Sequence, residues 1–511
     1  MQWLFKLLKT ERTPNRDQKA QVQPPHAPLF SPELREKTER LKARMGDSSD
    51  LVTRGLTVQW PPERMMHIEF HYVDGLVDSD LVQKLLIGSV MDRKPPANQP
   101  DADPLQLLSD YIINAGQLET VNNEEDALFR LVSGQVLCFV DTIAPGLAIA
   151  LPGMEDRGVS ESKAQTVVRG PQDAFTETLR TNTSLVRRRI KDPRMRVVEL
   201  SVGTVTKTNV ALLYIRGVAD EQMVEKVLES IRSIPLESVL EGQYVEEFIR
   251  DPRGSLFPTV LNTERPDSVS AALVEGRIAI IVDGTPFVLI VPALFLDFIQ
   301  SAEDYYQPYI YSNFIRMIRI LTLFGSMLAP SFYIAVTTFH QDLLPSQLLF
   351  SLAAQREGVP FPAFIEALLM EVTFEILREA GIRMPRTIGQ AVSIVGTLVI
   401  GQAAVEAGIV SAAMVIVVAI TAITSFVMPS YNLSIAIRLS RFLFMAAAAS
   451  FGIYGIVIGL LILITHLCSL RSQGIPYMAP YAPKNKKETT DALFRIPFSS
   501  KNRQNPKGGL K

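Results

Sequence analysis

The stretch MMHIEFHYVDGLVDSDLVQKLLIGSV, at 65–90, has a counterpart in VALLYIRGVADEQMVEKVLESI, at 210–231. Both stretches predict a strand, a turn at glycine and then a helix with an apolar face. An aspartate stands before each predicted helix, where its side chain can cap free backbone N–H groups. The residues that match at one spacing (217 − 75 = 142) are Tyr72 and Tyr214, Gly75 and Gly217, Asp78 and Asp220, Val82 and Val224, and Lys84 and Lys226.

A second motif recurs at the same spacing. LVSGQVLCFVD begins at Leu131, LVEGRIAIIVD begins at Leu273, and each ends in an aspartate, Asp141 or Asp283. One spacing shared by two separated motifs indicates an internal duplication. We therefore expect two related α/β subdomains, at 51–155 and 195–298, each with a strand–turn–helix unit and a later buried strand.

The segments around these subdomains are more polar. Residues 1–50 predict a mostly disordered tail with one short helix, and residues 156–194 predict a linking helix with a basic end. That end carries Arg187, Arg188, Arg189 and Lys191. These cations could form a solvated helix face, pair with nearby acidic residues, or bind an anionic partner such as a lipid headgroup.

The composition separates a polar half from an apolar half. The 511 residues are 47% hydrophobic, with a mean hydropathy of +0.17, although 20% are charged. A net charge of −2 gives no overall basic field, so nucleic acid is not an expected partner. Two cysteines in apolar runs do not suggest a disulfide framework. Since the apolar runs lie mainly after residue 299, we expect a membrane domain at 299–470.

Four apolar runs reach or approach the ~20 residues that cross ~30 Å of hydrocarbon. They predict spans at about 320–339, 388–405, 409–428 and 442–467. Tyrosines and arginines before the first run are typical of a membrane interface. Residues 471–511 predict a basic, disordered tail, and its lysines favour a cytoplasmic C-terminus. We expect the N-terminal region to be cytoplasmic as well.

A further apolar stretch between the first two predicted spans carries Glu366, Glu371 and Glu375. Carboxylates are costly in lipid, so this stretch predicts an interfacial or protein-covered helix, a candidate for gating, or a fifth helix in a wet bundle. The predicted fold class is an α+β membrane protein. Its cytosolic N-terminal region of two related α/β subdomains precedes an all-α transmembrane domain of four to five helices.

The run PRTIGQAVSIVGTLVIGQAAVEAGIVSAAM, at 385–414, combines apolar and polar residues. Gln390, Ser393, Thr397 and Ile400 fall on one face of the predicted 388–405 helix. That face suits either tight packing through small residues or a water-lined path. Glu406 follows near a predicted turn at the membrane surface, where it could ring a channel mouth if subunits assemble.

Catalytic motifs are absent from the sequence. It contains no phosphate-binding loop, metal cluster or nucleophile elbow, so we expect neither an enzyme nor a cofactor. His67 and His71 share one face of a predicted strand, but no third ligand stands near them in the sequence. We therefore predict no metal site.

Five stretches together resemble the A subunits of GerA-type spore germinant receptors. In chain order they are RGPQDAFTETLRTN, NTERPDSVSAALVEGRIAIIVDGTPF, EDYYQPY, FPAFIEALLMEVTFEILREAGIRMPRTIGQAVSIVGTLVIGQAAVEAGIVS and MPSYNLSIAIRLSRF. The resemblance extends over about residues 45–480. The family includes a paralogous branch associated with the spore dipicolinate-channel operon.

The resemblance implies a protein of the inner spore membrane that works with a permease-like B subunit and a lipoprotein C subunit. It implies a homo-oligomer, a pentamer, that forms a nutrient-gated ion channel with its pore wall on the 388–405 helix. The alternatives are an accessory paralogue tied to the dipicolinate channel, or a scaffold or transporter subunit without its own conductance. Secondary transporters carry their repeats inside the membrane, whereas this repeat lies in the polar half.

Overall fold

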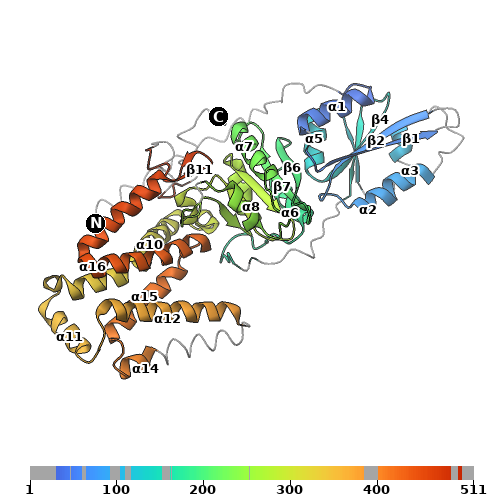
Figure 1. The fold of residues 1–511 in the computed structure, drawn as a ribbon. Helices are drawn as coiled ribbons and strands as arrows, with labels where there is room; N and C mark the ends of the chain where they lie inside the picture. The colour runs from blue at the N-terminus through green and yellow to red at the C-terminus, as the bar shows by residue number, and fades with distance from the viewer. Residues whose placement is uncertain are drawn as a thin grey trace, which may run out of the picture.

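The computed structural model describes residues 30–46, 48–59, 65–92, 104–109, 117–151, 162, 164–251, 254–384, 401–484 and 493–497. Two subdomains built on β-sheets are followed by a group of helices (Figure 1). The candidate residues Gln390, Ser393, Thr397 and Ile400 lie outside the described residues, as does most of the predicted span at 388–405.

The first subdomain is a five-stranded antiparallel sheet with helices on both sides (Figure 1). Its strand order is β1-β2-β4-β5-β3. The strands are β1 (Leu51–Gln59), β2 (Met65–Val73), β3 (Gln117–Val121), β4 (Gln135–Val140) and β5 (Gly146–Ala150). The helices are α1 (Leu34–Met45), α2 (Ser79–Leu81), the π-helix η2 (Val82–Gly88), α3 (Ser89–Asp92), α4 (Pro104–Leu107) and α5 (Glu124–Val132).

The second subdomain repeats this arrangement, with the strand order β6-β7-β9-β10-β8. Its strands are β6 (Met195–Val202), β7 (Thr208–Ile215), β8 (Leu261–Thr263), β9 (Ile278–Val282) and β10 (Val288–Val291). Its helices are α6 (Leu179–Arg189), α7 (Glu221–Arg232), α8 (Gly242–Ile249) and α9 (Pro266–Val274). Apolar side chains of α7 and α8 cover one face of the sheet, while those of α6 and α9 cover the other. Both faces are therefore buried.

The matching positions in the sequence occupy matching positions in the fold. Asp78 caps α2 by accepting from the N–H groups of Asp80 and Leu81, and Asp220 caps α7 in the same way. The terminal aspartates of the second motif also correspond. Asp141 Oδ1 accepts the N–H of Leu34 at 3.3 Å, and Asp283 Oδ1 accepts the N–H of Leu179 at 2.9 Å. Each of these bonds ties the start of a helix to the sheet that it covers.

The helix predicted as a linker belongs to the second subdomain. Leu185 and Val186 of α6 are buried against the second sheet, since an apolar stripe on this helix matches the apolar face of β7 and β9. Its basic end pairs with carboxylates: Arg187 contacts Asp50 at 2.8 Å, and Arg189 contacts Asp173 at 2.7 Å. These contacts support the interpretation that the cations pair with acidic residues of the chain.

The described parts of both predicted tails pack against the rest of the structure. Within residues 1–50, α1 packs on the first subdomain through Leu41 and Met45, which are buried in its core. After the helical bundle, the short strands β11 (Arg471–Ser472) and β12 (Ile475–Pro476) bring Tyr477 against the turn at Phe295–Phe298 that follows the second subdomain. Tyr477 is fully buried beside Phe295 and Phe298, so an aromatic contact holds this part of the C-terminal segment in place.

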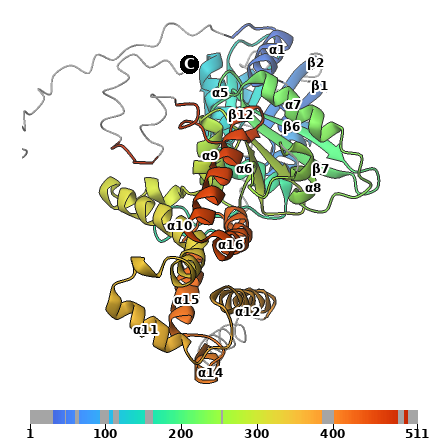
Figure 2. The same cartoon turned by 60° about the vertical axis from the view of Figure 1, so that its left-hand side comes forward.

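The helical bundle follows the second subdomain and begins with the 3₁₀ turns η5 (Phe295–Phe298) and η6 (Ala302–Tyr305). Figures 1 and 2 both place α11, α12 and α14 at the end of the bundle that is farther from the sheets. The remaining elements are α10 (Tyr309–Thr338), η7 (Gln341–Leu343), α11 (Ser346–Arg356), α12 (Ala363–Arg383), α14 (Gly401–Glu406), α15 (Ala412–Phe426) and α16 (Tyr431–Ser469).

Within the described part of the chain, two helices are long and apolar enough to cross a membrane, α10 and α16. The apolar helix α15 is shorter. The predicted span at 442–467 is not a continuous helix, because Gly452 has φ 57° and ψ −138° inside α16. An added Cβ at Gly452 would lie 2.8 Å from Nε2 of His340, so glycine permits both the bend and this close contact.

Candidate functional site

The carboxylates of α12 form the candidate site, because three of them meet partners from neighbouring helices. The site lies in the part of the bundle that contains α12, α15 and α16 (Figure 2). Glu366 and Glu371 are fully buried, and the side chain of Glu375 is 27% exposed. The three residues were predicted as a group on one interfacial or gating helix, and α12 does carry all of them.

Glu366 joins four elements of the bundle. Its Oε1 accepts the N–H of Ser411 at 2.6 Å and also the Ser411 hydroxyl. Ser411 is the N-cap of α15, and its hydroxyl lies 3.3 Å from the hydroxyl of Tyr333 in α10. Arg356 of α11 approaches Oε2 of Glu366 to 3.9 Å. A carboxylate at a helix N-terminus also interacts favourably with the helix dipole, so Glu366 is suited to fixing the start of α15.

Glu371 pairs with Arg441 of α16, and both side chains are fully buried. Among the residues that the structure describes, Oε1 of Glu371 and the Nε and Nη2 atoms of Arg441 have no hydrogen-bond partner. Charged groups in a protein interior are costly unless they are paired and hydrogen-bonded. Part of the hydrogen-bonding capacity of this pair is therefore not used by the described helices of the bundle.

Glu375 sits between two arginines. It lies 2.9 Å from Arg438 of α16 and 3.2 Å from Arg378 one helical turn along α12. Arg378 also donates to the hydroxyl of Ser425 in α15, at 3.1 Å. The ion pairs of Glu371 and Glu375 thus connect α12 to α16, and Arg378 connects it to α15.

The partners Arg438 and Arg441 were not identified as site residues from the sequence. They stand three residues apart in the apolar stretch MPSYNLSIAIRLSRF, so they share a helix face. Glu371 and Glu375 are four residues apart and also share a face. Matching one acidic and one basic pair at helical spacing would have indicated that α12 and α16 lie side by side.

Glu406, the last pore candidate, can be located. It ends α14 with an exposed side chain, and Nε2 of Gln402 donates to its Oε1 at 2.8 Å. Gly408, with φ 66°, follows in the turn that leads to Ser411. Glu406 thus stands near the Glu366–Ser411 contact in the sequence, but it is not part of the buried pairs.

A second polar cluster lies between the second subdomain and the bundle. Oε1 of Glu264 accepts the N–H groups of Ala164 at 2.6 Å and Gln165 at 2.8 Å. Arg265 forms a two-point ion pair with Asp267, at 2.6 and 3.1 Å. Three residues of the stretch NTERPDS therefore fold the preceding segment onto the start of α9.

Tyr306 continues this cluster toward α10. Its hydroxyl donates to Oδ2 of Asp267 at 2.6 Å. Burial, and then this hydrogen bond and the charge of Asp267, raises the pKa of Tyr306 to about 12. A Cβ on Gly170 would lie 2.5 Å from the Tyr306 ring, so a glycine is needed where the chain passes that ring. RGPQDAF, NTERPDS and EDYYQPY, far apart in the sequence, thus meet at this junction.

A cavity of about 260 Å³ adjoins the same junction. Its lining includes Thr263 and Arg265 of the second subdomain, Gln165 of the preceding segment, and the turn between α15 and α16. That turn includes Pro429 and Ser430. The cavity lies where the second subdomain, the connecting segment at 297–302 and the turn between α15 and α16 come together.

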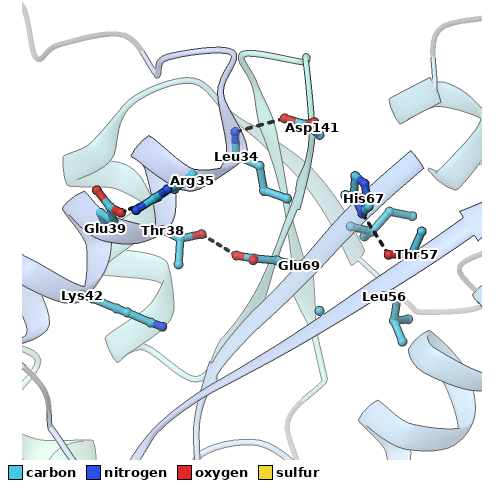
Figure 3. Close-up of a pocket in the computed structure, with 12 residues that line it drawn as sticks. Leu34, Arg35, Thr38, Glu39, Lys42, Leu56, Thr57, His67, Glu69 and Asp141 are labelled. Atoms are coloured by element: carbon cyan, nitrogen blue, oxygen red, sulfur yellow. Dashed lines mark hydrogen bonds and ion pairs between the residues drawn. The ribbon is translucent and has the colours of Figure 1, made fainter. Parts of the chain in front are cut away.

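A separate pocket of about 480 Å³ lies in the first subdomain, between α1 and strands β1 and β2 (Figure 3). Thr38 donates to Glu69 at its floor, and the hydroxyl of Thr57 lies 2.9 Å from Nδ1 of His67. The hydrogen bond with His71 is the main cause that lowers the pKa of Glu69. His67 and His71 are therefore engaged by separate hydrogen-bonding partners.

The chemistry of these sites is that of ion pairs and hydrogen bonds. Within the described residues, no group of three or more histidine, cysteine, aspartate or glutamate side chains could hold a metal ion. The ion pairs and hydrogen bonds of α12 can fix the position of this helix against its neighbours. Displacing one of the charges would change that position.

Comparison with protein families identifies the chain over most of its length. The family model described as "Bacillus/Clostridium GerA spore germination protein" matches residues 39–507. "Spore germination protein KA" of Bacillus subtilis (strain 168) is 46% identical over 470 residues, which are 92% of this chain and 86% of that protein. "Uncharacterized membrane protein YfkQ" of the same organism is 44% identical over 469 residues, 92% of this chain and 90% of that protein.

A solved structure is similar to part of the chain. It is described as the crystal structure of the N-terminal domain of the A subunit of the Bacillus megaterium spore germinant receptor GerK3. The match has 36% sequence identity and a TM-score of 0.43, and it covers 53% of this chain and 99% of that one. The family match over residues 39–507 and the two B. subtilis relatives show that this chain belongs to the Bacillus/Clostridium GerA spore germination protein family.

Proposed function

We propose that this chain is the A subunit of a spore germinant receptor in the inner spore membrane, and that it oligomerises into a nutrient-gated ion channel. Family membership supports the receptor role. By resemblance, the working receptor also contains a permease-like B subunit and a lipoprotein C subunit, and the A subunits form a pentamer. Ion release through this assembly would start germination.

The observation that carries the channel role is the set of buried ion pairs on α12. The outward side chains of the neighbouring helices are large and apolar, and they include Leu443 and Phe451 of α16, each 67% exposed. In a bundle that faces lipid, buried carboxylates and arginines mark functional positions rather than packing positions. Glu366, Glu371 and Glu375 are therefore proposed to set the position of α12, the gating helix.

The proposed pore wall is the helix at 388–405, with Gln390, Ser393, Thr397 and Ile400 on its lining face and Glu406 near its mouth. This assignment rests on the spacing of these residues and on the family resemblance. Because one chain contributes few spans, an assembly of several copies is required to enclose a water-filled path.

The test is ion flux through purified, reconstituted protein, together with ion release from spores that carry the same variants. Gln390→Leu and Thr397→Leu should each reduce flux at least tenfold, because they replace polar groups on the proposed lining face. Val395→Leu, off that face in the predicted helix, is the matched control and should leave flux within about twofold.

Two results would sink the proposal in different ways. Wild-type flux in both leucine variants, at normal protein levels, would show that the pore wall is misassigned. Absence of any flux from correctly assembled wild-type protein would favour a scaffold, a transporter subunit or an accessory paralogue of the dipicolinate channel. A cross-linking ladder that ends at five copies would support the pentamer.

A further inference from the structure

A short C-terminal segment, Leu493–Pro497, docks on the start of α10. The contact is made by Arg495 and Asn313, which exchange two hydrogen bonds. The N–H of Arg495 donates to Oδ1 of Asn313 at 2.6 Å, and Nδ2 of Asn313 donates to the Arg495 carbonyl at 3.1 Å. The side chain of Asn313 thus forms hydrogen bonds with both the N–H and the carbonyl group of Arg495, as the backbone of a neighbouring β-strand would.

The side chain of Arg495 enters a socket formed by the turn before α10. Its Nη1 donates to the carbonyl oxygens of Asp304 at 2.8 Å and Gln307 at 2.5 Å. The guanidinium group lies 5.6 Å from the centroid of the Tyr305 ring, a cation–π contact. Arg495 is only 7% exposed, although it belongs to a segment without helix or strand structure.

The socket is held in shape by contacts that do not involve the docked segment. The buried Asp304 carboxylate pairs with Arg316 at 3.0 Å and with Arg319 at 2.8 Å, both on α10. The Ser312 hydroxyl donates to the Asp304 carbonyl at 2.7 Å. The Asp304 carbonyl, one of the two groups that receive Arg495, is therefore positioned by α10 itself.

Arg495 is the most deeply buried residue of the docked segment. Phe494, beside Arg495, is 56% exposed and so adds little burial. Hydrogen bonds to main-chain carbonyls contribute modest net free energy, because water offers the same groups comparable partners. A segment with one deeply placed side chain in a pre-formed socket has the character of a bound peptide rather than of a core element.

We propose that the turn and first helical turn at 304–313 form a peptide-binding socket for an arginine-containing segment, and that its occupant is this chain's own Leu493–Pro497. Seating of Arg495 clamps the turn at 304–307 against the start of α10. Release of the segment frees the Gln307 end of that turn, while Asp304 stays paired with Arg316 and Arg319 of α10. Since Tyr306 of the same turn bonds Asp267 of the second subdomain, the docked segment fixes how the subdomain joins the bundle.

The experiment is amide hydrogen exchange on the full-length protein in detergent. Arg495→Ala and Asn313→Ala should each speed exchange in the 302–313 segment at least tenfold, because they empty the socket. Arg471→Ala removes an exposed arginine from the same C-terminal region and is the matched control. Exchange in β7 and β9 should stay unchanged in all variants.

Adding a synthetic peptide of residues 491–499 to the Arg495→Ala protein tests whether the socket binds the segment as a separate peptide. The peptide should restore protection of 302–313, whereas the same peptide with alanine in place of Arg495 should not. Three outcomes would overturn the proposal: unchanged exchange in the Arg495→Ala protein, faster exchange throughout the second subdomain, or protection that the peptide fails to restore.

Discussion

At the scale of single residues, the Glu371–Arg441 pair places two charges where neither exposes any surface. Removing one partner leaves the other charge buried without compensation, which costs about 3–5 kcal/mol in proteins. Removing both charges together avoids that cost. Stability therefore depends on the two charges being present or absent together, more than on what either residue contributes alone.

Glu371→Leu and Arg441→Met should each lower the free energy of unfolding in detergent by about 3–5 kcal/mol, and the double variant Glu371→Leu/Arg441→Met should lose less than either. Thermal and denaturant unfolding of the four proteins measures this cycle. The exposed pair Glu379–Arg383 is the control, and Glu379→Gln should cost at most about 1 kcal/mol. Losses that simply add in the double variant would contradict the expected coupling.

Glu246 of α8 gives a pH dependence to the second subdomain. Burial raises the pKa of Glu246 to about 7 from its ordinary value of 4.5, although Arg250 opposes the shift. Between these two values the folded protein binds the proton and the unfolded chain does not. The stabilising proton is thus present at low pH and is lost as the pH rises through about 7.

Stability should therefore fall by about 1.4 kcal/mol for each pH unit between about 4.5 and 7, relative to Glu246→Gln, which has no such proton. Denaturant unfolding at a series of pH values measures the difference between the two proteins. Glu247→Gln, at the exposed neighbouring position, should keep the wild-type slope. The same slope in the Glu246→Gln protein would show that another group titrates.

The sequence revealed one partner of each of the contacts on α12, the glutamate. Glu366, Glu371 and Glu375 were visible because carboxylates are rare in an apolar stretch. Their partners were not found, because pairing is a property of two helices and hydropathy describes one at a time. The same limit applies to Arg495, whose acceptors are main-chain carbonyl groups that no side-chain pattern reveals.

At the scale of elements, α16 shows where a composition-based span differs from a helix. The window 442–467 is predominantly apolar and carries no Asp, Glu, Lys or Arg, so hydropathy predicts one continuous span. Gly452 interrupts it with a backbone conformation that other residues rarely adopt. Hydropathy measures how apolar a stretch is and contains no information on backbone angles. The bend at Gly452 could therefore not be predicted from it.

Gly452→Ala should lower the apparent unfolding temperature of the detergent-solubilised protein by at least several degrees, because the added Cβ meets both a positive φ and the His340 ring. Gly325→Ala on α10 is the control, since its Cβ would meet only Thr424 at 3.9 Å in an ordinary helix. Alanine there should be neutral or slightly stabilising. Equal effects of the two substitutions would show that the bend at Gly452 is not needed.

At the scale of the whole molecule, the duplication was the part of the fold that the sequence revealed best. A spacing shared by turns, caps and terminal aspartates is a property of the order of residues, so it can be read directly. How the two subdomains meet depends on side chains with no such pattern. Arg187 of α6 contacts Asp50, which stands just before β1, and both side chains are 1% exposed.

Asp50→Asn should cost about 3–5 kcal/mol and should separate the unfolding of the two subdomains into distinct steps, because Arg187 then loses its buried counter-charge. Calorimetry of the full-length protein measures both effects. Asp173→Asn is the matched control, since its pair with Arg189 is partly exposed and should contribute at most about 1 kcal/mol. A single cooperative transition in the Asp50→Asn protein would contradict the expected role of this contact.

The two subdomains differ in the polarity of the side chains that lie between the sheet and the first helix, α1 or α6. Glu69 and His71 lie under α1, whereas Ala211 and Leu213 stand at the corresponding positions in the second subdomain and are buried. Water can replace the polar contacts under α1, but it gains nothing by entering the apolar contact under α6. Fluctuations that lift a helix from its sheet therefore cost less in the first subdomain, and heating should loosen the duplicated halves in sequence, beginning with α1.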